Sequence, residues 1–130
     1  MHVIETLDEL RLPEKYIKNL DFFLKNLSKV KNVEQVILFG SCARGSLRHN
    51  SDVDLMVIGD NITDEEEVFI YADCGPQYPS DYYLECDIFT SDSDWYDRMK
   101  TRIGSLQWRV EKDGKDLTKV MKEYERMVEA

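Results

Sequence analysis

The chain has 130 residues, of which 42% are hydrophobic and 33% are charged, so it can bury one core and is too apolar for a disordered chain. Its net charge of −9 and the absence of a basic block exclude a surface built for long nucleic acid, whose phosphates are neutralised by Lys and Arg. No apolar run reaches the ~18 residues needed to span a bilayer, so a membrane partner is not expected.

The first half of the chain predicts a helix, a strand, a turn and a second strand. A proline suited to the first helical position opens a run with apolar residues at helical spacing, so we expect a helix over 13–30. The apolar segment 32–40 is the first expected strand. Residues 41–47 predict a turn or short helix, and 52–58 predict a second strand.

The second half predicts further helices and one more strand. Residues 63–73 suit a short helix, because Thr63 can cap it and acidic residues fill its first turn. After a loop, the alternation over 81–90 predicts a third strand with Glu85 and Asp87 on one face. The remaining segments are a helix over 91–110 weakened at Gly104, a turn over 111–116, and an amphipathic helix over 117–128.

These elements predict an α/β fold with a small mixed β-sheet and flanking helices. We expect a single domain over 1–130, made of the N-terminal helix 13–30, a catalytic core over 33–89 and a C-terminal helical part over 92–130. The N-terminal stretch MHVIETLDELRL lacks the pattern of a signal peptide. The three cysteines are odd in number and have no metal-ligand spacing, so we expect small buried thiols in a cytoplasmic protein.

Two aspartates stand at the start of the second strand. Asp52 and Asp54 point the same way, with Val53 turned into the core between them. Carboxylates about 4–5 Å apart repel by a few kcal/mol at intermediate dielectric, so this pair favours a bound cation, and Mg²⁺ suits it best. A neighbouring strand that adds Asp87 would complete a cluster able to hold two metal ions, with Glu85 as the competing third ligand.

The turn before these aspartates carries features of an anion site. Gly40 allows a tight exit from the strand and a close backbone approach to a ligand. If a helix begins near Ser41, its free N–H groups and the serine hydroxyl can cradle a phosphate. Arg44 and Arg48 can add positive charge. Phosphate-binding groups beside metal-binding carboxylates together predict a site for a nucleoside triphosphate with Mg²⁺.

Gly40-Ser41, ten intervening residues and Asp52-Val53-Asp54 resemble the signature of the nucleotidyltransferase superfamily that includes DNA polymerase beta. The string GSCARGSLRHNSDVDL resembles its minimal nucleotidyltransferase branch in particular. The resemblance covers about 33–89; the segment WRVEKDGKDL is only loosely similar to the family's closing strand and turn. It implies the polymerase beta-like fold, with Asp87 in LECDIF matching the third carboxylate.

The resemblance also implies an activity. Asp52, Asp54 and Asp87 would be the catalytic, metal-binding carboxylates for two Mg²⁺ ions, and Gly40, Ser41 and Arg44 would bind the nucleotide. Members of the minimal branch commonly pair with a small all-helical toxin and act as its antitoxin by adding AMP to it. The chain is therefore expected to transfer AMP from ATP to a partner toxin. Two alternatives stay open: transfer to an aminoglycoside-type small molecule by a homodimer, and a nucleotide-binding masking module without turnover.

Each of these features also has a simpler interpretation. Asp52 and Asp54 could be a solvated strand end, and Asp87 could be a surface residue of an edge strand. Arg44 could contact a phosphate or make a local structural contact. Arg48 and His49 are expected to be surface loop residues, and position 46 lacks the lysine of an ATPase phosphate loop.

Overall fold

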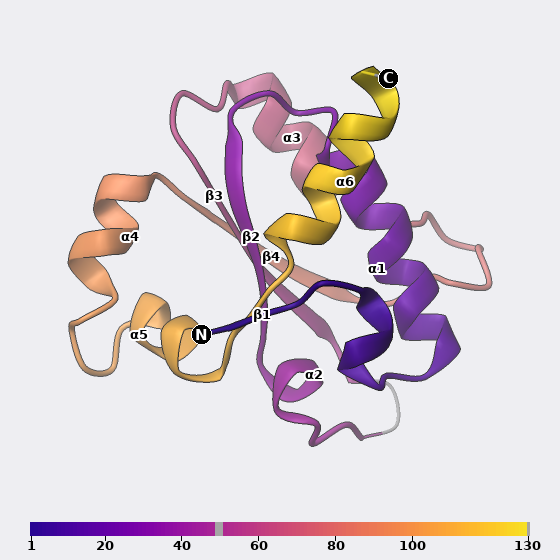
Figure 1. The fold of residues 1–130 in the computed structure, drawn as a ribbon, viewed down its shortest axis with the longest axis horizontal. Coiled ribbons are helices and arrows are strands. Elements are labelled where there is room, and N and C mark those ends of the chain that lie inside the picture. Colours follow the sequence, from indigo (N-terminus) through magenta and orange to yellow (C-terminus); the bar gives the residue numbers. More distant parts are fainter. Residues whose placement is uncertain (49–50, 130) are drawn as a thin grey trace.

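The computed structural model describes residues 1–48 and 51–129, which form a mixed five-stranded sheet with helices on both faces (Figure 1). The strand order is β1-β5-β2-β3-β4. In chain order the elements are β1 (His2–Val3), the 3₁₀ helix η1 (Leu7–Leu10), α1 (Glu14–Leu27), β2 (Val33–Phe39), α2 (Ser41–Arg44), β3 (Val53–Gly59), α3 (Asp64–Ala72), β4 (Cys86–Ser91), α4 (Ser93–Met99), α5 (Leu106–Asp113), β5 (Lys115–Asp116) and α6 (Thr118–Glu129). No helix in these residues is long and apolar enough to cross a bilayer.

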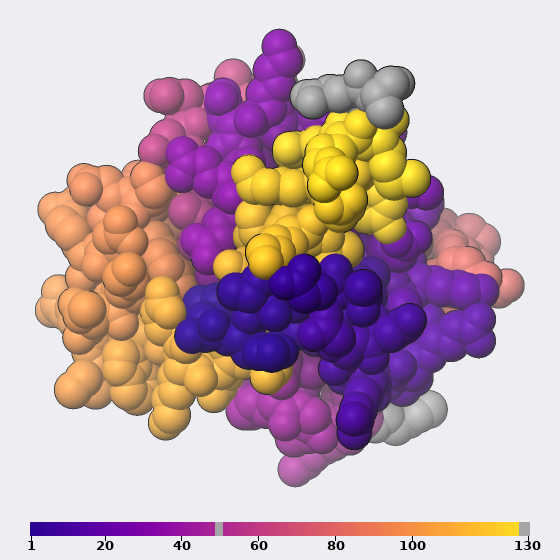
Figure 2. Space-filling model, viewed as in Figure 1, coloured from indigo at the N-terminus to yellow at the C-terminus, as the bar shows by residue number. Residues whose placement is uncertain are grey.

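The two central strands, β2 and β3, are buried on both faces, which explains their uninterrupted apolar runs. On one face Leu38 and Leu55 belong to the main core, together with Phe23 of α1 and Met121 of α6. Each such side chain contributes about 1.5–3 kcal/mol by leaving water. The N-terminal segment lies between α6 and α1 over this side of the molecule (Figure 2).

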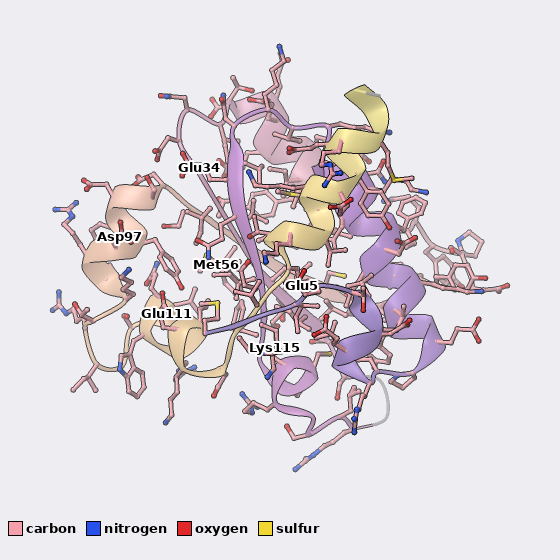
Figure 3. The ribbon with its side chains drawn as sticks, viewed as in Figure 1. Glu5, Glu34, Met56, Asp97, Glu111 and Lys115 are labelled. Atoms are coloured by element: carbon pink, nitrogen blue, oxygen red, sulfur yellow. The ribbon has the colours of Figure 1, made fainter. Side chains whose placement is uncertain are left out.

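A second, smaller core lies on the opposite face of the sheet. Ile37 and Met56 pack there with Tyr96 of α4 and Val110 of α5. Figure 3 shows Met56 on the same side of β2 as Glu111 of α5. α4 and α5 cover only part of this face. The first residues of β3 and β4, near α2, are therefore left uncovered by these helices.

The strand register decides which side chains meet at that open end. β2 and β3 are antiparallel, and Phe39 pairs with Asp54. β3 and β4 are parallel, and Asp54 pairs with Asp87. The end of β2, from which the chain enters α2, therefore lies beside two aspartates from adjoining strands.

The third predicted strand begins later than expected. β4 starts at Cys86, and residues 81–85 belong to the connection that precedes it. The main-chain groups of this connection are used locally: Tyr83 N–H donates to Ser80 C=O at 3.1 Å, and the Asn19 side chain donates to Tyr82 C=O at 2.9 Å. Alternation alone did not reveal these bonds.

The prediction of one helix over 91–110 was wrong. Two helices, α4 and α5, are separated near Gly104, which has a left-handed φ of 90°. Ser105 then starts α5 by accepting a hydrogen bond from Trp108 N–H at 3.0 Å. The expected turn over 111–116 is divided between the end of α5 and β5, which pairs with β1 and β2.

The other helices agree with the prediction apart from their ends. α1 covers Glu14–Leu27 within the expected 13–30, and α3 has the expected cap, since Thr63 Oγ1 accepts from Glu66 N–H at 3.1 Å. The short elements β1 and η1 carry too few residues to show a period and were not predicted.

Candidate active site

The turn after β2 is closed around one glycine. Gly40 has φ 75°, and a Cβ at this position would overlap the carboxylate of Asp54. The following residues form the short helix α2, in which Ala43 and Arg44 N–H groups donate to Gly40 C=O at 3.1 and 3.0 Å. The N–H groups of Ser41 and Cys42 precede these bonded groups, so they are available to an acceptor.

The three predicted carboxylates lie at the same end of the sheet. Asp54 and Asp87 are paired across β3 and β4, and Asp52 stands just before β3, separated from Asp54 by the fully buried Val53. Because side chains alternate along a strand, Asp52 and Asp54 share one side of β3. Asp52 and Asp87 are exposed, whereas Asp54 is half-buried.

The pKa of Asp54 is raised to about 6. Burial is the largest cause, followed by the negative charge of Asp87 and its contact with that side chain, and then by the charge of Asp52; Arg44 acts in the opposite direction. In the absence of a cation, this carboxylate therefore resists ionisation. A site that holds negative charges together in this way favours a positive ligand.

One open pocket of about 550 Å³ joins the turn to the carboxylates. Its lining is entirely polar: Ser41, Arg44, Ser46, Arg48, Ser51, Asp52, Asp54 and Asp87. Five of the six predicted site residues line this pocket, and the sixth, Gly40, lies against Asp54. The competing ligand Glu85 does not line it; Glu85 is exposed and accepts a hydrogen bond from Tyr83 Oη at 3.0 Å.

Arg44 makes the structural contact that was one of the two roles considered for it. It lines the pocket and its guanidinium also bonds the Asp113 carboxylate at 3.2 Å, which connects α2 to α5. Half of the Arg44 side chain is exposed, so solvent weakens this ion pair.

Three lining residues were not predicted as site residues. Ser46, Arg48 and Ser51 reach the pocket because the loop after α2 folds back towards β3. Ser51 Oγ accepts from Arg48 N–H at 2.7 Å, and Tyr16 Oη donates to Ser51 C=O at 2.9 Å, which tethers the loop to α1. Arg48 is exposed, as expected of a loop residue, yet belongs to the pocket; His49 lies outside the described residues.

The cysteines agree with the sequence-based expectation. All three are free, with Cys42 and Cys74 buried and Cys86 half-buried. Burial raises the pKa of the Cys42 thiol to about 11, so it stays protonated, and its Sγ donates to Asp52 C=O at 3.3 Å. Cys42 therefore supports the main chain at the first aspartate.

The donor set suits Mg²⁺, which prefers carboxylate oxygens, keeps several waters and shares substrate phosphates. As the side chains stand, no three His, Cys, Asp or Glu residues in the described part of the chain form a metal-ligating group. Asp52 and Asp87 are exposed and can turn towards a common ion. The raised pKa of Asp54 reflects its burial and the nearby negative charges of Asp87 and Asp52, an arrangement that a bound cation would stabilise.

The fold and this pocket together define a nucleotidyltransferase domain, with a mixed sheet, a glycine–serine turn and carboxylates on two adjoining strands. The family model for "Polymerase beta, Nucleotidyltransferase" matches residues 23–119, and the chain belongs to this family. Members of the family transfer nucleotidyl groups from nucleotide donors.

Two solved structures are similar to this chain. One, from Sulfolobus solfataricus and provisionally described as a nucleotidyltransferase, has 19% identity and a TM-score of 0.40, covering 67% of this chain and 82% of its own. The other is a toxin–antitoxin structure with AMP-PNP, with 18% identity and a TM-score of 0.47, covering 84% of this chain and 82% of its own. We draw neither substrate nor partner from similarities at this level. No curated protein matches the chain.

Proposed function

We propose that this protein transfers AMP from ATP to a hydroxyl group of a partner protein, with Mg²⁺ held by Asp52, Asp54 and Asp87. The observation that carries the proposal is the single polar pocket in which these carboxylates meet the Ser41 turn. A triphosphate placed there has anion-binding groups at one end and carboxylates for its metal at the other.

The turn residues would hold the phosphates. Ser41 offers its hydroxyl and its N–H, and Cys42 offers a second N–H, all at the start of α2. Arg44 and Arg48 also line the pocket and would add positive charge. Gly40 permits the phosphates to approach the main chain, since a side chain there would fill the space next to Asp54.

The carboxylates would bind Mg²⁺ and handle the acceptor. When bound, Mg²⁺ supplies the positive charge that offsets the triphosphate and the departing pyrophosphate. Asp87 lies on β4, at the outer side of the carboxylate pair, and is exposed. In the transfer, the acceptor oxygen bonds to the α-phosphorus, the bond to the bridging oxygen breaks, pyrophosphate leaves with the electron pair, and Asp87 takes the hydroxyl proton.

A protein acceptor is favoured by the openness of the pocket and by the resemblance to the minimal nucleotidyltransferases. The described residues after Asp87 form α4, α5, β5 and α6, and none of them lines the pocket. The lining residues therefore come from β3, β4 and the 41–52 segment alone, which leaves the acceptor side open to a macromolecule. By resemblance, we propose a small helical toxin as this partner.

The test is transfer of label from each of the four nucleoside triphosphates, labelled at the α-phosphate, in the presence of Mg²⁺. The acceptors are the protein encoded beside this chain and, separately, an aminoglycoside mixture. We expect ATP-dependent labelling of the protein, a mass increase of one AMP, and loss of labelling with EDTA. Label on the aminoglycoside instead would contradict the protein acceptor, and nucleotide binding without any transfer would contradict catalysis.

A further inference from the structure

The strand that carries Asp87 lies at the edge of the sheet. β4 is the last strand in the order β1-β5-β2-β3-β4, and only β3 pairs with it in the described residues. All six residues of β4 are half-buried or exposed, whereas β2 and β3 are largely buried. An exposed edge is a surface to which another strand can add.

The outward main-chain groups of β4 can be identified from one hydrogen bond. Val53 N–H donates to Glu85 C=O at 2.9 Å, and in a parallel ladder alternate residues of a strand bond to the same neighbour. The groups of Asp87 and Phe89 therefore face β3. Those of Ile88 and Thr90 face away, and no main-chain or side-chain group within the described residues is hydrogen-bonded to them.

The two faces of β4 offer different contacts to an added strand. On the carboxylate face, Asp87 is followed by Phe89, which is 38% exposed and packs on Phe39 with 5.9 Å between ring centroids. On the other face a pocket of about 240 Å³ lies beside Ile88, between β4 and the end of α3. Alternate side chains of an added strand would enter this pocket and approach Asp87.

The charge around the edge favours a basic occupant. The 47 residues from Ser51 to Asp97, which contain β3, α3 and β4, include 14 Asp and Glu and no Lys, Arg or His. On β4 and directly before it, Asp87 and Glu85 are exposed. This acidic third of the chain would repel an acidic segment and attract one rich in Lys or Arg.

We propose that the acceptor is an extended, basic segment of the partner protein, outside its helices, which adds to β4 as a further strand and presents a Ser or Thr hydroxyl beside Asp87. This inference rests on the proposed function and names how its substrate binds. Neighbouring strands lie about 4.8 Å apart, with Cβ atoms of facing residues about 4.5–5.5 Å apart, so such a hydroxyl reaches the Asp87 carboxylate. Its proton passes to Asp87 as its oxygen bonds to the α-phosphorus and pyrophosphate leaves.

Two substitutions of Thr90 form a matched pair of variants. Thr90 itself lies in neither the metal site nor the nucleotide site. Thr90→Pro removes an outward N–H and leaves the bonds between β3 and β4, since proline is tolerated on an edge strand. Thr90→Val keeps that N–H. Both variants lose the hydroxyl contact between Thr90 Oγ1 and Tyr71 Oη, so this loss cancels in the comparison.

The probes are peptides with a central serine between β-branched residues and with lysines at both ends. Each peptide is made unmodified and in two N-methyl frames, in which every second residue carries an N-methyl group, starting from the first or from the second residue. Binding is measured by fluorescence anisotropy without nucleotide, and transfer by label from α-labelled ATP with Mg²⁺. We expect one N-methyl frame to abolish binding and transfer while the other is tolerated. Thr90→Pro should lower both by about tenfold, the effect of a lost main-chain hydrogen bond, and Thr90→Val by less than about twofold.

Equal loss in the two Thr90 variants, equal behaviour of the two N-methyl frames, or no peptide binding to the wild-type protein would each overturn strand addition. Thermal unfolding of both variants checks that β4 is intact. Failure of the proposed function is distinguished by a separate measurement: if the wild-type protein binds no Mg-ATP, the nucleotide site is wrong, whatever the peptides show.

Discussion

Gly40 meets two separate requirements at the candidate active site. Its φ of 75° lies in the left-handed region that favours glycine, and its missing side chain leaves room for the Asp54 carboxylate. Gly45, at the end of α2, has nearly the same φ, 74°, but nothing within 4 Å of an added Cβ. The two glycines share a positive φ and differ in ψ, −156° at Gly40 and 16° at Gly45, and only a side chain at Gly40 would contact Asp54.

We expect Gly45→Ala to lose about 1–2 kcal/mol of unfolding free energy from left-handed strain. Gly40→Ala should lose more, because the ψ of −156° at Gly40 belongs to a region almost restricted to glycine and its added Cβ would overlap Asp54. Only Gly40→Ala should displace Asp54, and a misplaced catalytic group can cost about 100-fold in rate. Denaturant unfolding and initial rates of AMP transfer measure the two effects. Equal activity in the two variants would show that the Gly40–Asp54 approach does not matter to the reaction.

Asp54 is predicted to destabilise the metal-free protein at neutral pH. A carboxyl group whose pKa is raised by folding, here to about 6, favours the folded state while it is protonated, and this contribution is lost as the pH rises through the range from about 4 to about 6. Asp54→Asn stays neutral throughout. With allowance for solvent screening, it should be about 1 kcal/mol more stable than wild type at pH 7 and level with it near pH 4.

Thermal unfolding in EDTA between pH 4 and pH 8 tests this prediction. The difference between Asp54→Asn and the wild type should grow with pH over that interval. Mg²⁺ with ATP should stabilise the wild type and leave the variant unchanged. Parallel stability curves for the two proteins would contradict the environment assigned to Asp54.

At the scale of elements, one ion pair joins α2 to α5 beside the pocket. Arg44 bonds Asp113 at 3.2 Å, so a helix that does not line the pocket holds one of its cations. Sequence patterns could not show this contact, because 69 residues separate its partners. Nor could they show β5, whose two residues pair with β1 and β2, two strands that lie far earlier in the chain.

Asp113→Asn should leave the unfolding free energy within about 0.5 kcal/mol, because the ion pair is solvent-exposed. It removes a negative charge and frees Arg44, so ATP should bind several-fold more tightly, whereas Arg44→Ala should weaken it by about tenfold. Calorimetric titration with Mg-ATP measures both. Asp97→Asn, which breaks the pair with Lys100 on α4, is the control and should not change the affinity.

At the scale of the whole molecule, local patterns predicted the central strands, most helices and the residues that meet at the site. The continuous apolar runs of β2 and β3 and the spacing from Gly40 to Asp54 were sufficient for that. The start of β4 and the division of α4 from α5 depend on side-chain bonds to main-chain groups, as at Asn19 and Ser105. The loop that carries Arg48 and Ser51 into the pocket is bonded to Tyr16 of α1, a contact that no local pattern could show.

The central claim is that Asp52, Asp54 and Asp87 hold a divalent ion next to a turn that binds a triphosphate. Calorimetric titration of ATP into the wild-type protein and into Asp52→Asn, each with Mg²⁺ and with EDTA, tests it most directly. We expect tight binding only by the wild type with Mg²⁺, and at least a tenfold loss in the other three titrations with unchanged thermal unfolding of the variant. Equal affinity in all four titrations would contradict the account.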